Sequence, residues 1–77
     1  MQISLTDMKT NETGTVVNIL GGRRVHNRLR ALGIQPGVRV AKVSGALMRS
    51  PVILQVGGTQ AALGFGISYK VIVEVER

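Results

Sequence analysis

The sequence predicts one small, mainly β domain: a barrel of about five short strands with a single helix between the first two. Two observations carry this prediction. Short runs rich in β-branched residues alternate with glycine turns along most of the chain, which is typical of small all-β domains. The 77 residues, 44% of them hydrophobic, are enough for only one core. Residues 1–77 are therefore expected to form a single domain.

Five segments carry the strand pattern. The last is the clearest, because Val71, Val73 and Val75 point to one side and the residues between them to the other. Gly57-Gly58 separates two of the segments and predicts a hairpin, since glycine supplies the positive φ angles that such turns need. The predicted strands cover residues 15–20, 38–44, 52–56, 60–63 and 71–76.

Residues 23–32 form the predicted helix between the first two strands. An apolar stripe at helical spacing marks its buried face, and it consists of Val25, Leu29 and Leu32. Gly33 follows where a helix-ending glycine belongs, and Pro36-Gly37 then makes a turn.

Two further segments fit short helical turns. Ser4, with Asp7 three residues later, predicts a capped turn within residues 4–10. Asn11 suits left-handed backbone in the turn that follows. Residues 64–70 remain ambiguous between a loop and a single helical turn weakened by its glycines.

The sequence offers no constellation for catalysis or for a cofactor. Glu74 and Glu76 lie close together on one strand, but no nucleophile or base accompanies them, so they are interpreted as a solvated strand face. His26, the only histidine, is expected to face solvent between Arg23 and Arg30, whose charges disfavour a metal ion. Cysteine is absent. We expect no enzyme, no cofactor and no metal site.

Basic residues give the strongest surface signal. The net charge is +6, which fits either an anionic partner or simple solubility. The helix would present four arginines opposite its apolar stripe, and a loop at residues 45–51 adds an exposed apolar and basic group. These candidate partner-binding residues are Arg23, Arg24, Arg28, Arg30, Leu47, Met48 and Arg49.

Three explanations of the basic helix remain open: an acidic protein surface, a phosphate backbone, or solvation alone. Phe65 and Tyr69 are the only aromatic residues, and this argues against a single-strand nucleic-acid binder that stacks bases. The stretch from residue 50 to residue 69 carries no charge, but glycines and Pro51 interrupt it, so we do not expect a membrane span. The start of the sequence has no signal-peptide pattern, and the cytoplasm is the expected location.

The sequence resembles small bacterial FeoA proteins along nearly its whole length. The most specific segment is the run R-L-x-x-L-G-[IL]-x-P-G at residues 28–37. Further matching segments are Leu5-Thr6-Asp7-Met8, Gly14-Thr15-Val16, Gly21-Gly22, Ala62-Leu63-Gly64 and residues 71–75. Two positions depart from the family pattern: Arg49-Ser50-Pro51 stands in place of a common Gly-Asp-Pro turn, and Asn11 in place of a glycine.

The resemblance implies an SH3-like barrel that carries a helical insertion. It also implies a cytosolic accessory role in ferrous iron uptake, in which the chain binds and modulates the cytosolic portion of the FeoB-type iron transporter and meets the membrane only through it. The same barrel resembles the C-terminal domain of iron-dependent repressors, but this chain has no DNA-binding domain. The alternative function is that of a basic nucleic-acid-binding small barrel. Neither the oligomeric state nor the direction of the effect on transport follows from the sequence.

Overall fold

The computed structural model describes residues 1–45 and 50–77. The predicted partner-binding residues Leu47, Met48 and Arg49 lie outside the described residues. The strands are β1 (Gln2–Ser4), β2 (Thr13–Ile19), β3 (Arg39–Ser44), β4 (Val52–Val56), β5 (Thr59–Leu63) and β6 (Val71–Glu74). The helical elements are a 3₁₀ turn, η1 (Leu5–Asp7), and two helices, α1 (Arg23–Ala31) and α2 (Phe65–Ser68).

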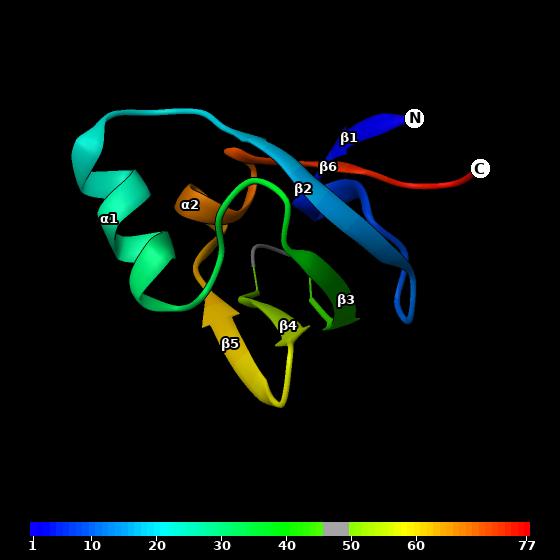
Figure 1. The fold of residues 1–77 in the computed structure, drawn as a ribbon. Helices are drawn as coiled ribbons and strands as arrows, with labels where there is room; N and C mark the ends of the chain where they lie inside the picture. The colour runs from blue at the N-terminus through cyan, green and yellow to red at the C-terminus, as the bar shows by residue number, and fades with distance from the viewer. Residues whose placement is uncertain (46–49) are drawn as a thin grey trace.

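The strands form one antiparallel sheet in the order β1-β6-β2-β3-β4-β5, which curls into an SH3-like barrel (Figure 1). The mainly β prediction is confirmed, but the described residues contain six strands rather than about five. The additional strand is β1, whose three residues are too few to show a period of two. Because β1 comes first, α1 follows the second strand and connects β2 to β3.

The predicted strand boundaries differ from the observed ones by up to two residues. β4 has the expected bounds, whereas β6 ends at Glu74 and not at residue 76. The inward row of the last strand is confirmed, since Val71, Val73 and Val75 are all buried. Val75 stays buried beyond the end of the strand because its N–H donates to the carbonyl of Met1 at 2.9 Å.

The core is almost entirely aliphatic, as the composition requires. It draws on every strand except β1, and on η1, α1 and the segment that follows α1. Its buried members are Leu5, Met8, Val16, Ile19, Leu29, Ile34, Val40, Val52, Leu54, Val56, Ala61, Leu63, Val71, Val73 and Val75.

The predicted apolar stripe of α1 is wrong at Leu32, because the helix ends before this residue. Leu29 is fully buried, but Leu32 is 39% exposed because the helix ends at Ala31. Gly33 adopts φ +82°, and the N–H of Ile34 then donates to the Leu29 carbonyl at 2.9 Å. This is a Schellman ending, in which the residue after the glycine packs back on the last turn. Ile34 therefore takes the buried place that helical spacing assigns to Leu32.

The residues with positive φ in the turns are of types that tolerate this backbone conformation. Asn11 has φ +71°, and Gly57, in the β4–β5 hairpin, has φ +58°. The Ser4 hydroxyl accepts a bond from the Thr6 N–H and so caps η1. The ambiguous stretch after β5 contains the helical turn α2, where the buried Ser68 hydroxyl donates to the carbonyls of Leu63 and Gly64.

A lysine occupies a core position on β3. Lys42 is only 2% exposed, and its ammonium group donates to the carbonyls of Leu5, Thr6 and Met8 at 3.4, 3.1 and 2.8 Å. Burial lowers the pKa of Lys42, against the opposing effect of nearby Asp7 and Glu12. The side chain thereby ties the N-terminal segment to the middle of the sheet.

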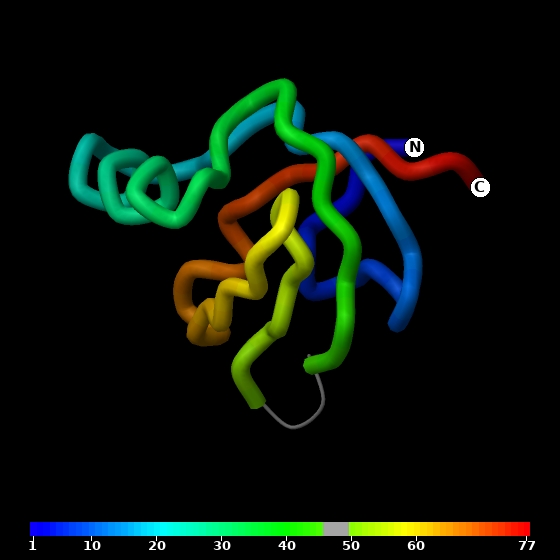
Figure 2. Tube along the Cα trace, turned by 60° about the horizontal axis from the view of Figure 1, so that its bottom comes forward, coloured from blue at the N-terminus to red at the C-terminus, as the bar shows by residue number. Residues whose placement is uncertain are grey.

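Two views place the chain termini together at one end of the molecule and α1 at the other (Figures 1 and 2). The N-terminal amine of Met1 donates to the Val75 carbonyl at 2.9 Å and forms an ion pair with Glu74. Within residues 1–45 and 50–77, neither α1 nor α2 has the length and apolar character of a membrane-spanning helix.

The buried ammonium can be tested by Lys42→Met, which keeps an apolar stem but removes the donor. Three carbonyls then lose a hydrogen-bond partner, and we expect the free energy of unfolding to fall by about 1–3 kcal/mol. Urea unfolding followed by circular dichroism measures this, and Lys9→Met, at an exposed position, is the matched control. If Lys42→Met were as stable as the parent, the apolar part of the side chain alone would hold residues 5–8 in place, and the ammonium group would contribute nothing.

Candidate partner-binding surface

The four arginines of α1 are all exposed, as predicted. Arg28 and Arg30 lie in the last turn, where cations favour the helix dipole. Arg23 and Arg24 lie in the first turn, where a cation is disfavoured by about 0.3–1 kcal/mol. The first turn carries no acidic residue, and the N-cap is Gly22, without a side-chain cap. Helix stability therefore does not account for arginines at the start of α1.

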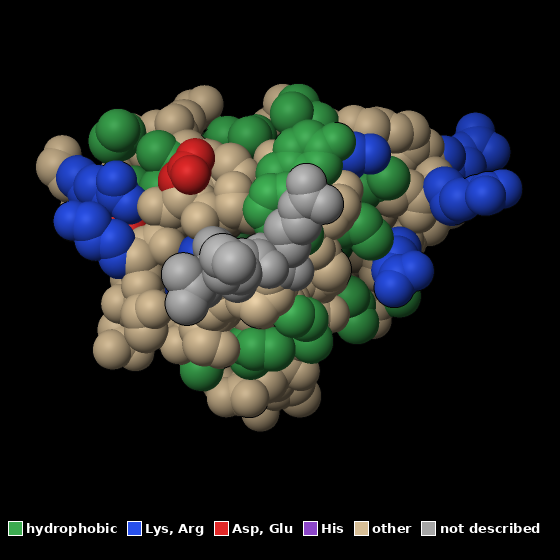
Figure 3. Space-filling model, turned by 180° about the vertical axis from the view of Figure 1, so that it is seen from behind, with side chains coloured by type: hydrophobic (Ala, Val, Ile, Leu, Met, Phe, Trp, Pro, Cys, Tyr) green, Lys and Arg blue, Asp and Glu red, His purple; other side chains and the backbone are tan. Residues whose placement is uncertain are grey.

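Helical geometry arranges these arginines in two rows. Arg24 and Arg28 are one turn apart on one side, and Arg23 and Arg30 are two turns apart on the other. The exposed Asn27 and Ala31 lie between the rows. Lys and Arg side chains gather at the α1 end, on the right in Figure 3, and a second group of them lies at the opposite end. We call these four arginines the arginine face.

The described ion pairs lie away from the arginine face. Arg77 donates to both carboxylate oxygens of Glu12 at 2.9 Å and to the carbonyl of Asp7 at 3.0 Å. The second pair joins Met1 and Glu74. Both pairs lie at the end that holds the termini. Glu12 and Glu74 are paired there within the molecule, while the arginine face takes part in no ion pair among the described residues.

The Glu12 carboxylate has a strongly perturbed pKa. The hydrogen bonds from Arg77 are the largest cause, and the bond from the Lys9 N–H adds to them, so the pKa of Glu12 is lowered to about 2. The pKa of Glu74 is also lowered, chiefly by its bond to the N-terminal amine. In both cases hydrogen bonds to a basic group stabilise the charged carboxylate, and this lowers its pKa.

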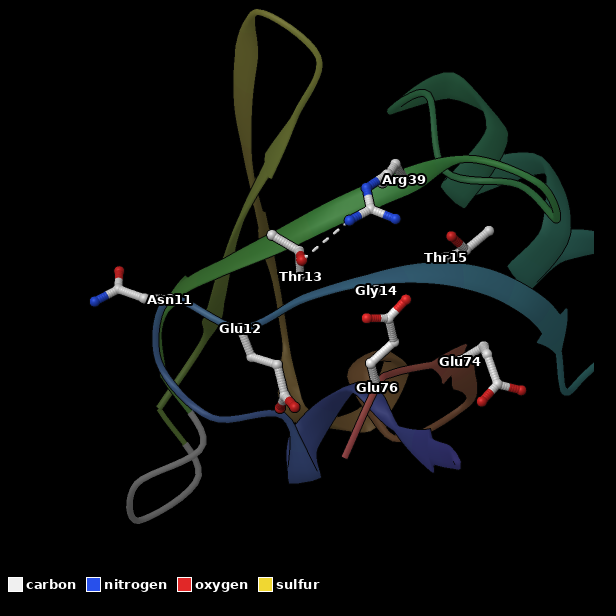
Figure 4. A pocket seen from close by; sticks show the side chains of 8 residues that line it. All are labelled: Asn11, Glu12, Thr13, Gly14, Thr15, Arg39, Glu74 and Glu76. Atoms are coloured by element: carbon white, nitrogen blue, oxygen red, sulfur yellow. Dashed lines mark hydrogen bonds between the residues drawn. The ribbon is translucent and has the colours of Figure 1, made fainter.

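A depression of about 380 Å³ lies at the same end (Figure 4). It is lined by Asn11, Glu12, Thr13, Gly14, Thr15, Arg39, Glu74 and Glu76. Gly14 is required in its wall, because a Cβ atom there would lie 2.9 Å from the Glu74 carbonyl oxygen. Arg39 donates to the Thr13 hydroxyl at 3.3 Å.

The depression does not bring a nucleophile and a base together. Glu74 and Glu76 line the depression and are both exposed, as the solvated-face interpretation expects. Glu12 and Glu74 are already engaged by Arg77 and Met1. Of the charged lining residues, Glu12 and Glu74 are therefore paired, whereas Glu76 and Arg39 take part in no ion pair among the described residues.

His26 differs from its prediction. It is partly buried rather than turned to solvent, because it lies beside Leu29 on the inner half of α1. Its backbone N–H donates to the Gly22 carbonyl at 3.1 Å in the first turn of the helix. Among residues 1–45 and 50–77, no three His, Asp or Glu side chains gather as a metal site would require.

Two features of the structure are not indicated by the sequence pattern. Lys42 lies in a valine-rich strand, and its in-facing position two residues after Val40 is the only sequence signal. The two aromatic residues are both exposed at α2, Phe65 at 39% and Tyr69 at 47%. The adjacent Gly64 and Gly66, with no atoms that would obstruct a Cβ, mark this segment as a surface turn.

The curled antiparallel sheet with η1, α1 and α2 defines a protein of the SH3-like barrel class. The family model of the FeoA domain matches residues 3–75, and the chain belongs to the FeoA family. Membership implies a role in ferrous iron transport, and this accessory-protein family is not an enzyme family.

Solved structures agree with this assignment. A crystal structure of an iron uptake regulatory protein (FeoA) is 34% identical, with 96% of each chain covered and a TM-score of 0.87. A FeoA-like protein from Clostridium acetobutylicum is 22% identical over 99% of this chain and 88% of its own, with a TM-score of 0.84.

The fold also occurs as part of larger proteins. A manganese-dependent transcriptional repressor is 16% identical over 97% of this chain but only 42% of its own, with a TM-score of 0.88. At that identity the likeness shows the fold alone. No curated protein matches the sequence.

The Glu12–Arg77 pair predicts a pH dependence. The unfolded chain takes up a proton at Glu12 near pH 4.5, the folded chain only near pH 2. The stabilisation is therefore present above about pH 4.5 and is lost as the pH falls through about 2. Acid titration of the unfolding midpoint should show this loss. Glu12→Gln should flatten it, whereas Glu76→Gln, the charge-matched control, should not. An unchanged profile in Glu12→Gln would contradict the assignment.

Proposed function

We propose that this chain is a small cytosolic accessory protein of ferrous iron uptake that binds and modulates the FeoB-type transporter at its cytosolic portion. Membership of the FeoA family supports the uptake role. The observation that carries the binding role is the arginine face, which is exposed and takes part in no ion pair among the described residues.

The arginine face fits a carboxylate-bearing protein surface. Guanidinium groups bind carboxylates with two parallel hydrogen bonds, and the two rows on α1 would engage acidic side chains on either side of Asn27. Charges at the edge of an interface chiefly steer association and set its salt dependence. The predicted contacts of Leu47, Met48 and Arg49, outside the described residues, remain part of the proposal.

The test is a titration against the full-length transporter in nanodiscs at low and physiological salt. Arg24→Glu combined with Arg28→Glu should weaken binding by about tenfold or more at low salt, because attraction becomes repulsion. Lys9→Glu combined with Arg39→Glu is the matched control, since it changes the net charge equally at exposed sites outside α1. Equal effects of the two double variants would show that net charge, not the arginine face, governs binding.

Two further titrations, against empty nanodiscs and against random DNA, test other partners of the arginine face. Empty nanodiscs of the same lipid separate transporter binding from attraction to phospholipid. The arginine face would also fit a phosphate backbone, so random DNA is titrated in parallel. Absence of transporter binding, together with a steep loss of DNA binding on added salt, would favour the nucleic-acid alternative and overturn the proposal.

A further inference from the structure

Three large apolar side chains remain exposed at the junction of β2 and α2. Leu20, Phe65 and Tyr69 are 46%, 39% and 47% exposed. The ring centroids of Phe65 and Tyr69 are 6.3 Å apart, so these residues form an exposed pair. The Leu20 N–H donates to the Lys70 carbonyl at 2.8 Å, which brings the end of β2 beside the residue that follows Tyr69. We call these three side chains the apolar patch.

The fold does not depend on the exposed rings. α2 is fixed by the buried Ser68, whose hydroxyl bonds two carbonyls, and by Ile67, which packs on the core. The contact of Tyr69 with the N-terminal segment is made by its backbone, since its carbonyl accepts a bond from the Ser4 hydroxyl. The only two aromatic side chains of the sequence are thus presented outward. Large aromatic residues, with arginine, dominate the energetic centres of protein interfaces.

The surroundings of the apolar patch are cationic. The Lys70 ammonium lies 5.9 Å from the centroid of the Tyr69 ring. The arginine face begins at Arg23, three residues after Leu20, so patch and arginines are continuous along the chain. Glu12 and Glu74 are engaged at the end that holds the termini. A complementary partner therefore presents apolar side chains flanked by carboxylates.

We propose that Leu20, Phe65 and Tyr69 form the apolar centre of the surface that docks on the transporter, with Lys70 and the arginine face as its cationic rim. The occupant is an amphipathic, acidic segment of the transporter's cytosolic portion. This inference rests on the proposed function. Apolar contacts at an interface centre chiefly slow dissociation, whereas rim charges speed association. The two parts of the surface therefore have separable kinetic effects.

The experiment measures association and dissociation rates on the full-length transporter in nanodiscs, at two salt concentrations. Tyr69→Ala and Leu20→Ser, on different elements, should each weaken binding by about tenfold, mainly through faster dissociation and with an unchanged salt dependence. Tyr69→Phe should stay within about twofold of the parent, since it keeps the ring. Leu32→Ala is the matched control, because Leu32 is an exposed leucine at the other end of α1.

The possible outcomes distinguish the apolar patch from the proposed function. Melting temperatures close to the parent's confirm that the variants are folded, and Leu20→Ser stands in should Tyr69→Ala disturb α2. Parent-like dissociation rates in both variants, with normal binding by the parent, would overturn the apolar patch and leave the proposed function in place. Absence of binding by the parent itself would overturn both. An equal loss in Leu32→Ala would also contradict the patch, because any exposed apolar group would then suffice.

Discussion

The buried ammonium of Lys42 is the interaction on which the N-terminal half of the fold depends. With no disulfide and no aromatic side chain in its core, so small a barrel needs every covering segment held in place. Lys42 fixes one such segment from within, because its side chain holds three carbonyls of residues 5–8. Its backbone bonds Asn11 and Glu12 as well. Leu5 and Met8 are thereby kept over the core.

This anchoring divides the molecule into two ends of different character. With residues 5–12 fixed, Glu12 meets Arg77 and the amine of Met1 meets Glu74, so these two carboxylates are paired within the molecule. The opposite end carries the arginine face, and Leu20 of the apolar patch precedes Arg23 by three residues in the sequence. The proposed partner-binding surface lies on α1 and α2, and the sheet holds these two helices in place.

Much of this architecture follows from the sequence where the pattern is local. The alternation of residues 71–75 and the glycine turns predict strands and hairpin directly, and the exposure of the arginine face follows from helical spacing. Features that depend on contacts between distant segments cannot be predicted from such local patterns. Leu32 leaves the core because Gly33 ends the helix one residue earlier and Ile34 replaces it. β1 exists only through its pairing with β6, and Lys42 is tolerated inside only because three distant carbonyls converge on it.

The most direct test of this account is amide hydrogen–deuterium exchange of the unmodified chain, alone and bound to the full-length transporter in nanodiscs. The account predicts that the complex slows exchange in α1, in α2 and at Leu20. Exchange in residues 11–15, which line the depression near the termini, should not change. Protection confined to the depression, with α1 and α2 unaffected, would place the partner at the opposite end of the molecule and contradict the account.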